Sequence, residues 1–190
     1  MAKVDSKNKP PKKRLDPIVK IGLTVFIGGF LLIASGMFLS RPDRTIPPYS
    51  IGWQEGTVVA VHVPAWTSDP EIKTLIHRFR DLGLSAHDFR SMKVRPTTPE
   101  DPKRLYQEMI LYIFSDPNWT EPDTLHRYLM DKEGLEEETF RREFQKAARG
   151  GFIYLHGKTK GWIGPIPDKA KPEKKQNIQM LFDDDSLSQT

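Results

Sequence analysis

The chain has 190 residues, of which 28% are charged, a length that allows one domain of ordinary size with appendages at its ends. It contains no cysteine, which excludes a disulfide framework, a thiolate metal site and a cysteine nucleophile. The net charge of +4 does not indicate a nucleic-acid partner, because residues 1–20 hold seven Lys or Arg against two Asp and the remainder carries one more acid than base.

An uncharged apolar run follows this basic segment. Residues 21–39 read IGLTVFIGGFLLIASGMFL, and at about 1.5 Å per residue such a helix covers nearly the ~30 Å hydrocarbon core of a bilayer. Ile18, Val19 and a snorkelling Lys20 extend it. We therefore predict one transmembrane helix at residues 18–39. A cleaved signal peptide is the alternative, but the run is long for one and no small-x-small cleavage site follows.

The flanking charges predict an orientation for this helix. Residues 1–17 form a basic tail that the positive-inside rule places in the cytoplasm, so the rest of the chain is expected on the periplasmic side of a cell inner membrane. The lipid bilayer and other membrane protein subunits are then the expected partners. Gly22, Gly29 and Gly36 recur every seven residues and share one helix face, which favours close helix–helix packing. The alternative is that glycine is simply common in membrane helices.

The first half of the remaining chain reads as a β-α-β unit. Residues 40–56 are rich in proline and predict an extended linker, and the folded domain is expected over residues 57–164. Residues 57–63 (TVVAVHV) predict a strand. Residues 68–71 (SDPE) form a capping box before apolar positions at helical spacing, and residues 89–95 predict a second strand.

The second half predicts helices followed by a hairpin. Residues 103–114 (KRLYQEMILYIF) are so apolar that periodicity leaves a strand and a buried helix equally open. Together the two halves predict an α+β fold class. The remaining expected elements are two helices and the two strands of the hairpin: residues 120–129, 135–149, 152–155 and 161–163.

The segment LHRYLMDKEGLEEETFRREFQKAARGGFIYLHGKTKGWIG resembles the winged-helix superfamily, and the resemblance extends over residues 103–164. It implies that residues 135–149 match the helix that enters a DNA groove and that the hairpin is the wing. Glu136, Glu137 and Glu138 depart from the DNA-binding pattern, because phosphates need cations at that helix start. The resemblance therefore implies a fold and a protein-binding use, without DNA binding.

A second architecture results if residues 103–114 form a strand. The chain then reads β-α-β-β-α, an open α/β sandwich of ferredoxin-like type. The segment VVAVHVPAWTSDPEIKTLIHRFRDLGL is also similar to the first half of periplasmic SPOR modules, which implies peptidoglycan binding. Pro64, Ala65 and Trp66 stand where that family has other residues.

No catalytic pattern was found in the sequence. The five histidines form no H-E-x-x-H motif and no i,i+4 pair, and there is no glycine-rich phosphate loop and no G-x-S-x-G. We therefore predict no catalytic residue, no metal, no cofactor and no small-molecule substrate. Residues 165–190 predict a flexible tail that ends in a short apolar cluster beside three aspartates. The expected partner contacts are Trp66, Trp119, Trp162, Met180, Leu181 and Phe182.

These features predict a non-catalytic, single-pass accessory or scaffold subunit of a larger membrane complex, such as a respiratory or photosynthetic one. Two alternatives stay open. One is a membrane-tethered winged-helix regulator that binds DNA and has the inverted topology. The other is a periplasmic peptidoglycan-binding protein.

Overall fold

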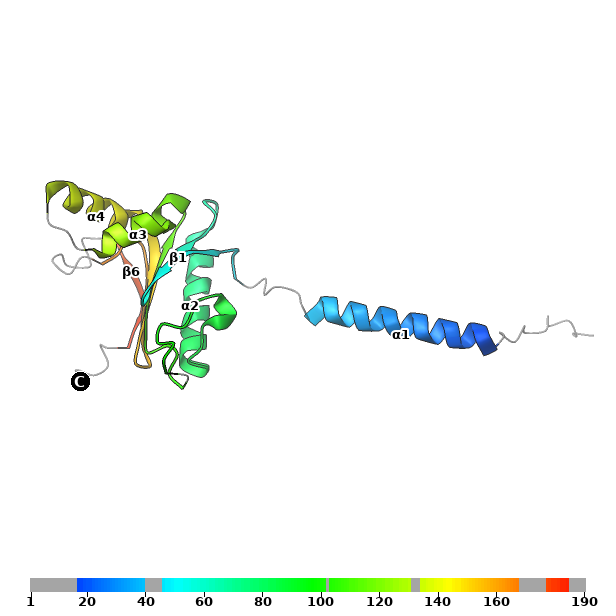
Figure 1. Ribbon diagram of the computed structural model, residues 1–190. Helices are drawn as coiled ribbons and strands as arrows, with labels where there is room; N and C mark the ends of the chain where they lie inside the picture. Colours follow the sequence, from blue (N-terminus) through cyan, green and yellow to red (C-terminus); the bar gives the residue numbers. More distant parts are fainter. Residues whose placement is uncertain (1–16, 40–45, 102, 131–133, 168–176, 185–190) are drawn as a thin grey trace, which may run out of the picture. The chain divides into compact units, whose positions relative to one another are not determined.

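The computed structural model describes residues 17–39, 46–101, 103–130, 134–167 and 177–184, drawn in colour in Figure 1. The chain separates into two units, Met1–Asp43 and Arg44–Thr190, and each is considered by itself. The first unit contains the helix α1 (Pro17–Leu39). The second is an α+β domain built on a six-stranded sheet. The predicted basic tail of residues 1–17 lies, apart from Pro17, outside the described residues.

The prediction of a transmembrane helix at residues 18–39 is contradicted. No helix in the part of the chain that the structure describes is both long enough and apolar enough to cross a membrane. The predicted single-pass inner-membrane location, with a periplasmic domain, rested on that helix and is contradicted with it.

The six strands lie in the sheet in the same order as in the chain. The neighbours β2 and β3 are parallel, and every other neighbouring pair is antiparallel. The helix α2 (Asp69–Ser85) makes the crossover between the two parallel strands. The strands are β1 (Ser50–Glu55), β2 (Val58–His62), β3 (Glu108–Phe114), β4 (Ala148–Leu155), β5 (Lys158–Ile163) and β6 (Gln179–Asp183).

Helices cover both faces of this sheet (Figure 1). Because side chains alternate along a strand, Val59 and Val61 enter the core beneath α2, whereas Val58 and Ala60 enter a second core on the opposite face. The second core is covered by the other helical elements: η2 (Pro117–Thr120), α3 (Pro122–Leu129) and α4 (Leu135–Ala147).

The predicted α2 helix is confirmed together with its capping box. The Glu71 carboxylate accepts a hydrogen bond from the Ser68 backbone N–H at 2.8 Å and another from the Ser68 hydroxyl at 2.7 Å. Four apolar side chains of α2 are fully buried against the sheet: Ile72, Leu75, Ile76 and Phe79. The helix can approach the sheet closely because Gly161 has no side chain. A Cβ atom at Gly161 would lie only 2.9 Å from the Ile76 side chain.

Several elements differ from the sequence-based predictions. Residues 103–114 contain the strand β3 and no helix. Residues 89–95 form the short 3-10 helix η1 (Arg90–Met92) in place of a strand, and the expected linker over residues 40–56 contains the strand β1. The helix expected over residues 135–149 ends at Ala147, and the strand β4 begins at the next residue, Ala148. Residues 103–114 became a strand through pairing with β2 and β4, partners that are distant in sequence and that periodicity does not reveal.

The winged-helix resemblance correctly orders two helices and a hairpin, but the hairpin is not a wing. The strands β4 and β5 lie inside the sheet, where β4 pairs with β3 and β5 pairs with β6. The arrangement of α2, β3 and the hairpin is nearer to the second architecture, in which residues 103–114 form a strand.

The strand β6 replaces part of the predicted flexible tail of residues 165–190. The Arg80 guanidinium contacts the Asp184 carboxylate at 3.0 Å across 104 positions of sequence. The same carboxylate accepts hydrogen bonds from the Thr159 backbone N–H at 3.1 Å and from its hydroxyl at 2.5 Å. Asp184 therefore ties the end of β6 to both β5 and α2.

Replacing Asp184 by alanine is expected to detach β6 at a cost of about 1.5–3 kcal/mol, the range for losing a hydrogen bond to a charged group. Amide hydrogen exchange measures this effect as faster exchange at residues 179–183, with the rest of the sheet protected. Glu143→Ala is the control, since Glu143 is an exposed acid on α4. Equal exchange in both variants would contradict the anchoring role of Asp184.

Candidate functional site

The helix α1 carries an exposed apolar surface. Every described side chain of this helix is exposed, and its large apolar side chains are 49–77% exposed. No atom lies within 4 Å of the position that a Cβ would take on Gly22, Gly29 or Gly36. Within its own unit, nothing that the structure describes covers this apolar helix. We call the described side chains of residues 21–37 the α1 surface.

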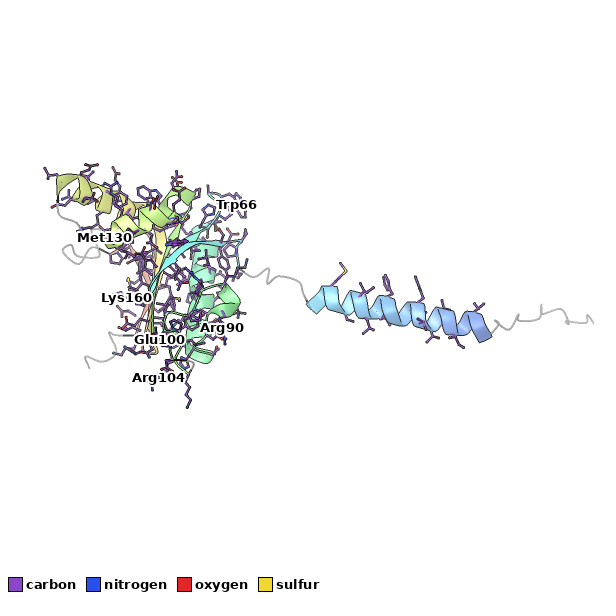
Figure 2. The ribbon with its side chains drawn as sticks, in the orientation of Figure 1. Trp66, Arg90, Glu100, Arg104, Met130 and Lys160 are labelled. Atoms are coloured by element: carbon purple, nitrogen blue, oxygen red, sulfur yellow. The ribbon has the colours of Figure 1, made fainter. Side chains whose placement is uncertain are left out.

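Of the predicted partner contacts, Trp66 is displayed on the surface of the domain. Its side chain is 68% exposed on the turn that follows β2 (Figure 2). The turn is ordered, because the Thr67 N–H donates to the Pro64 carbonyl at 2.9 Å and Arg149 donates to the Thr67 carbonyl at 3.1 Å. Trp66 is therefore an aromatic side chain held out on a fixed support.

The other two tryptophans belong to the domain interior. Trp162 is 1% exposed, and its indole N–H donates to the Pro165 carbonyl at 2.9 Å. Trp119 is half-buried and lies beside Phe140 and Phe144, with ring centroids about 6 Å apart. Trp119 packs against the second core, and the Trp162 ring lies beside Tyr112, which also packs against that core.

The predicted contacts Met180, Leu181 and Phe182 are half-buried in β6. The Phe182 ring packs against Phe152 with centroids 6.3 Å apart, and the Arg80 guanidinium lies 4.4 Å above it. These side chains complete the domain's own sheet. The structure therefore does not gather the six predicted contacts on one surface.

A polar cavity of about 370 Å³ opens at the other end of the sheet from Trp66. Figure 2 shows Arg104, one of its lining residues, at the end of the domain opposite to Trp66. The lining comes from the segment after α2, the segment before β3 and the turn between β4 and β5: His87, Lys103, Arg104, Tyr106, Gln107, Tyr154, His156 and Gly157. We call it the basic pocket.

Local backbone structure fixes the wall of the basic pocket that carries its cations. The Asp101 carboxylate accepts hydrogen bonds from the backbone N–H groups of Lys103 at 3.0 Å and Arg104 at 3.1 Å. The Thr98 N–H donates to the Leu105 carbonyl at 2.9 Å and closes the loop. Such side-chain-to-backbone bonds hold a turn in one conformation.

The facing wall is a two-residue hairpin turn. His156 and Gly157 both have positive φ values, 48° and 86°, as the primed turns that suit twisted hairpins require. The His156 N–H donates to the Gln107 carbonyl at 2.8 Å, which joins this turn to the segment before β3. A carboxylate oxygen of Glu108 lies 3.6 Å from His156 Nε2.

Two buried tyrosines form the floor. The Tyr154 hydroxyl lies 2.8 Å from His87 Nδ1, and the Tyr106 hydroxyl donates to the Val94 carbonyl at 2.8 Å. Phe89 packs edge-on against both rings. Burial raises the pKa of the Tyr154 hydroxyl. Burial also raises the pKa of Tyr106 to about 12, with a smaller contribution from the negative charge of Asp88. Both phenols are therefore neutral hydrogen-bonding groups at ordinary pH.

The electrostatics of the basic pocket favour an anion. Lys103 and Arg104 are exposed and form no ion pair with any residue that the structure describes. None of the described lining residues is acidic. Across the described segments, no group of three or more His, Asp or Glu is placed to hold a metal ion.

Sequence reasoning missed the basic pocket. His87 and His156 were considered there only as metal ligands, and their separation by 69 positions carries no signal of a shared site. A local hint within the described residues is the turn-forming pair His156-Gly157. Bringing the two walls together requires the pairing of β3 with β4, which places Glu108 opposite Leu155.

The buried tyrosines predict a loss of stability at alkaline pH. An unfolded tyrosine has a pKa of about 10, so the raised pKa of Tyr106 stabilises the fold fully below about pH 10. That contribution is lost as the pH rises toward about 12. The denaturant midpoint of unfolding should therefore fall as the pH is raised from about 9 to about 11.5. The fall should be less steep in Tyr106→Phe, because this variant lacks the hydroxyl that ionises. Parallel slopes would contradict this prediction.

Comparison with known proteins gives no match: no family model, no curated protein and no solved structure is similar to this chain. The winged-helix and SPOR resemblances gain no support from it.

Proposed function

We propose that the chain is a non-catalytic accessory subunit of a larger protein assembly, in which α1 packs against an apolar helix of a partner protein. The observation that carries this proposal is the α1 surface, an apolar helix that the described residues of its own unit leave uncovered. Contiguous apolar surfaces larger than a few hundred Å² are rarely left in water and usually mark interaction sites.

The shape of the α1 surface supports a helix as the occupant. Gly22, Gly29 and Gly36 lie on one face, and the space beside each is empty. Small residues at one face let two helix backbones approach closely and gain van der Waals contact. The large apolar side chains on either side of this face then have a second helix to pack against.

The second unit supports the proposal as a separately folded domain. It has its own two cores, so it does not need α1 to fold. Trp66 offers an additional contact, because exposed aromatic side chains on rigid supports are common anchors at interfaces. One segment for assembly and one folded domain are the arrangement expected of an accessory subunit.

The test is isolation of the full-length tagged protein from its native cells in mild detergent, followed by native gel electrophoresis. We expect a discrete larger complex with reproducible partners. A photo-crosslinking residue in place of Phe30, on the α1 surface, should form an adduct with one of those partners. The same residue in place of Lys73, on the outer side of α2, should not.

Two glycine variants sharpen this test. Gly29→Leu fills the glycine face and is expected to weaken assembly about tenfold, equivalent to about 1.4 kcal/mol. Gly28→Leu makes the same change about 100° around the helix and should have a smaller effect. Recovery only as a free monomer, binding only to protein-free lipid vesicles, or equal effects of both variants would contradict the proposal.

A further inference from the structure

We infer that the basic pocket is a binding site for a small organic phosphate, such as a sugar phosphate. This inference is independent of the proposed role of α1, because the basic pocket lies wholly within the second unit. It rests on the charge of the pocket, its size and the hydrogen bonds that fix its walls.

The charge indicates an anion. Lys103 and Arg104 are adjacent in the chain, and neither is neutralised by a described residue. The nearby carboxylate of Asp101 accepts the two backbone N–H groups, so it serves the turn and leaves the side-chain cations available. Two free cations beside a cavity form an anion site when their positions are fixed.

The donor set favours phosphate over a single carboxylate. Arginine offers a planar fork of donors, lysine offers three, and His87 adds a ring nitrogen. His87 is held in place by the Tyr154 hydroxyl at 2.8 Å. When that hydroxyl donates to Nδ1, the ring hydrogen is on Nε2, which is then a donor. This many donors around one cavity match the three terminal oxygens and the double charge of a phosphate ester.

The size of the cavity argues for more than a free phosphate ion. About 370 Å³ lies within the range of small-molecule sites, about 300–1,000 Å³. The buried rings of Tyr106 and Tyr154 give the floor an apolar part, against which the carbon skeleton of a sugar-sized ligand can pack. The cations at one wall and the rings at the floor thus divide the pocket between a charged and a less polar end.

The test uses the full-length protein and ribose 5-phosphate as the probe, with binding measured by calorimetry. Ribose is the matched ligand without phosphate, and gluconate is a carboxylate of similar size. We expect measurable binding of ribose 5-phosphate, with binding of ribose and gluconate at least about tenfold weaker, since neither offers the doubly charged group that the two cations would bind.

Variants locate the site. Arg104→Ala and Lys103→Ala should each weaken binding about tenfold or more. Lys73→Ala removes an exposed positive charge from α2, away from the pocket lining, and should leave binding unchanged. Tyr154→Phe is a test of positioning: it should weaken binding a few-fold and shift the His87 ring signals in the NMR spectrum of the unliganded protein.

Four outcomes would overturn the inference. They are no binding of ribose 5-phosphate, equal binding of ribose, tighter binding of gluconate, and equal affinity in Arg104→Ala, Lys103→Ala and Lys73→Ala. Circular dichroism of each variant distinguishes loss of the site from loss of the fold. None of these results bears on assembly through α1, which is measured separately.

Discussion

Replacing Phe144 by alanine is expected to lower the free energy of unfolding of the domain by about 3–5 kcal/mol, the range for a buried phenylalanine. Phe144 is the fully buried residue of α4, and its ring stacks on Tyr128 with centroids 4.0 Å apart. It also meets Phe114 of β3 edge-on at 4.9 Å. One side chain thereby joins α4, α3 and the sheet.

The loss is expected to be concentrated on one face of the sheet. Phe144 is the fully buried residue of α4, whereas Phe140 and Ala147 are only partly buried against the same core. The core beneath α2 does not include Phe144. Hydrogen exchange should therefore show α3 and α4 opening first, while β2 and β3 keep their protection.

Leu135→Ala is the matched control for this prediction. Leu135 lies in the same helix but is 86% exposed, so its truncation should change stability by less than about 0.5 kcal/mol. Chemical denaturation measures both variants. Similar losses in the two variants would mean that Phe144 is not the anchor of α4.

Elements defined by local patterns could be predicted from the sequence. The capping box at Ser68 and the helical spacing of α2 are local signals, and both are found in the structure. The hairpin expected from strands at residues 152–155 and 161–163 is likewise found, as β4 and β5. In each case the residues that determine the conformation lie within a few positions of one another.

Elements that depend on distant partners were missed. The strand β6 follows a segment rich in proline and lysine, and it is held by Arg80 and by pairing with β5. The strand β1 is a different case, because its partner β2 is adjacent in the chain and the prolines before β1 favoured a linker. For residues 103–114 both helix and strand satisfied the apolar pattern, and the pairing of β3 with β2 and β4 decided the outcome.

Two of the predicted partner contacts instead meet distant residues of their own domain. Trp162 and Phe182 were expected to contact a partner, but each fills a space in its own domain. Gly150 and Gly151 directly follow the helix expected over residues 135–149. In the structure they are strand residues that admit α2 on one face and the Trp162 ring on the other.

Replacing Gly151 by alanine is expected to destabilise the domain by about 1–3 kcal/mol or more, although it adds a single methyl group. The added Cβ would lie 2.5 Å from Trp162 Cη2 and 2.9 Å from the Leu111 carbonyl oxygen. The carbonyl belongs to the neighbouring strand β3 and cannot move without disturbing the sheet. The indole is fixed by its hydrogen bond to the Pro165 carbonyl.

Two comparisons isolate the steric cause. Gly28→Ala makes the same change in α1, where no atom lies within 4 Å, and it should not alter unfolding of the domain. Trp162→Phe removes the ring atoms that the new methyl group meets, so the double variant should be more stable than the sum of the two single changes predicts. A double-mutant cycle by chemical denaturation measures this coupling, which is expected at about 0.5–3 kcal/mol for residues in contact. Strict additivity would show that the Leu111 carbonyl, and not the indole, limits the space at Gly151.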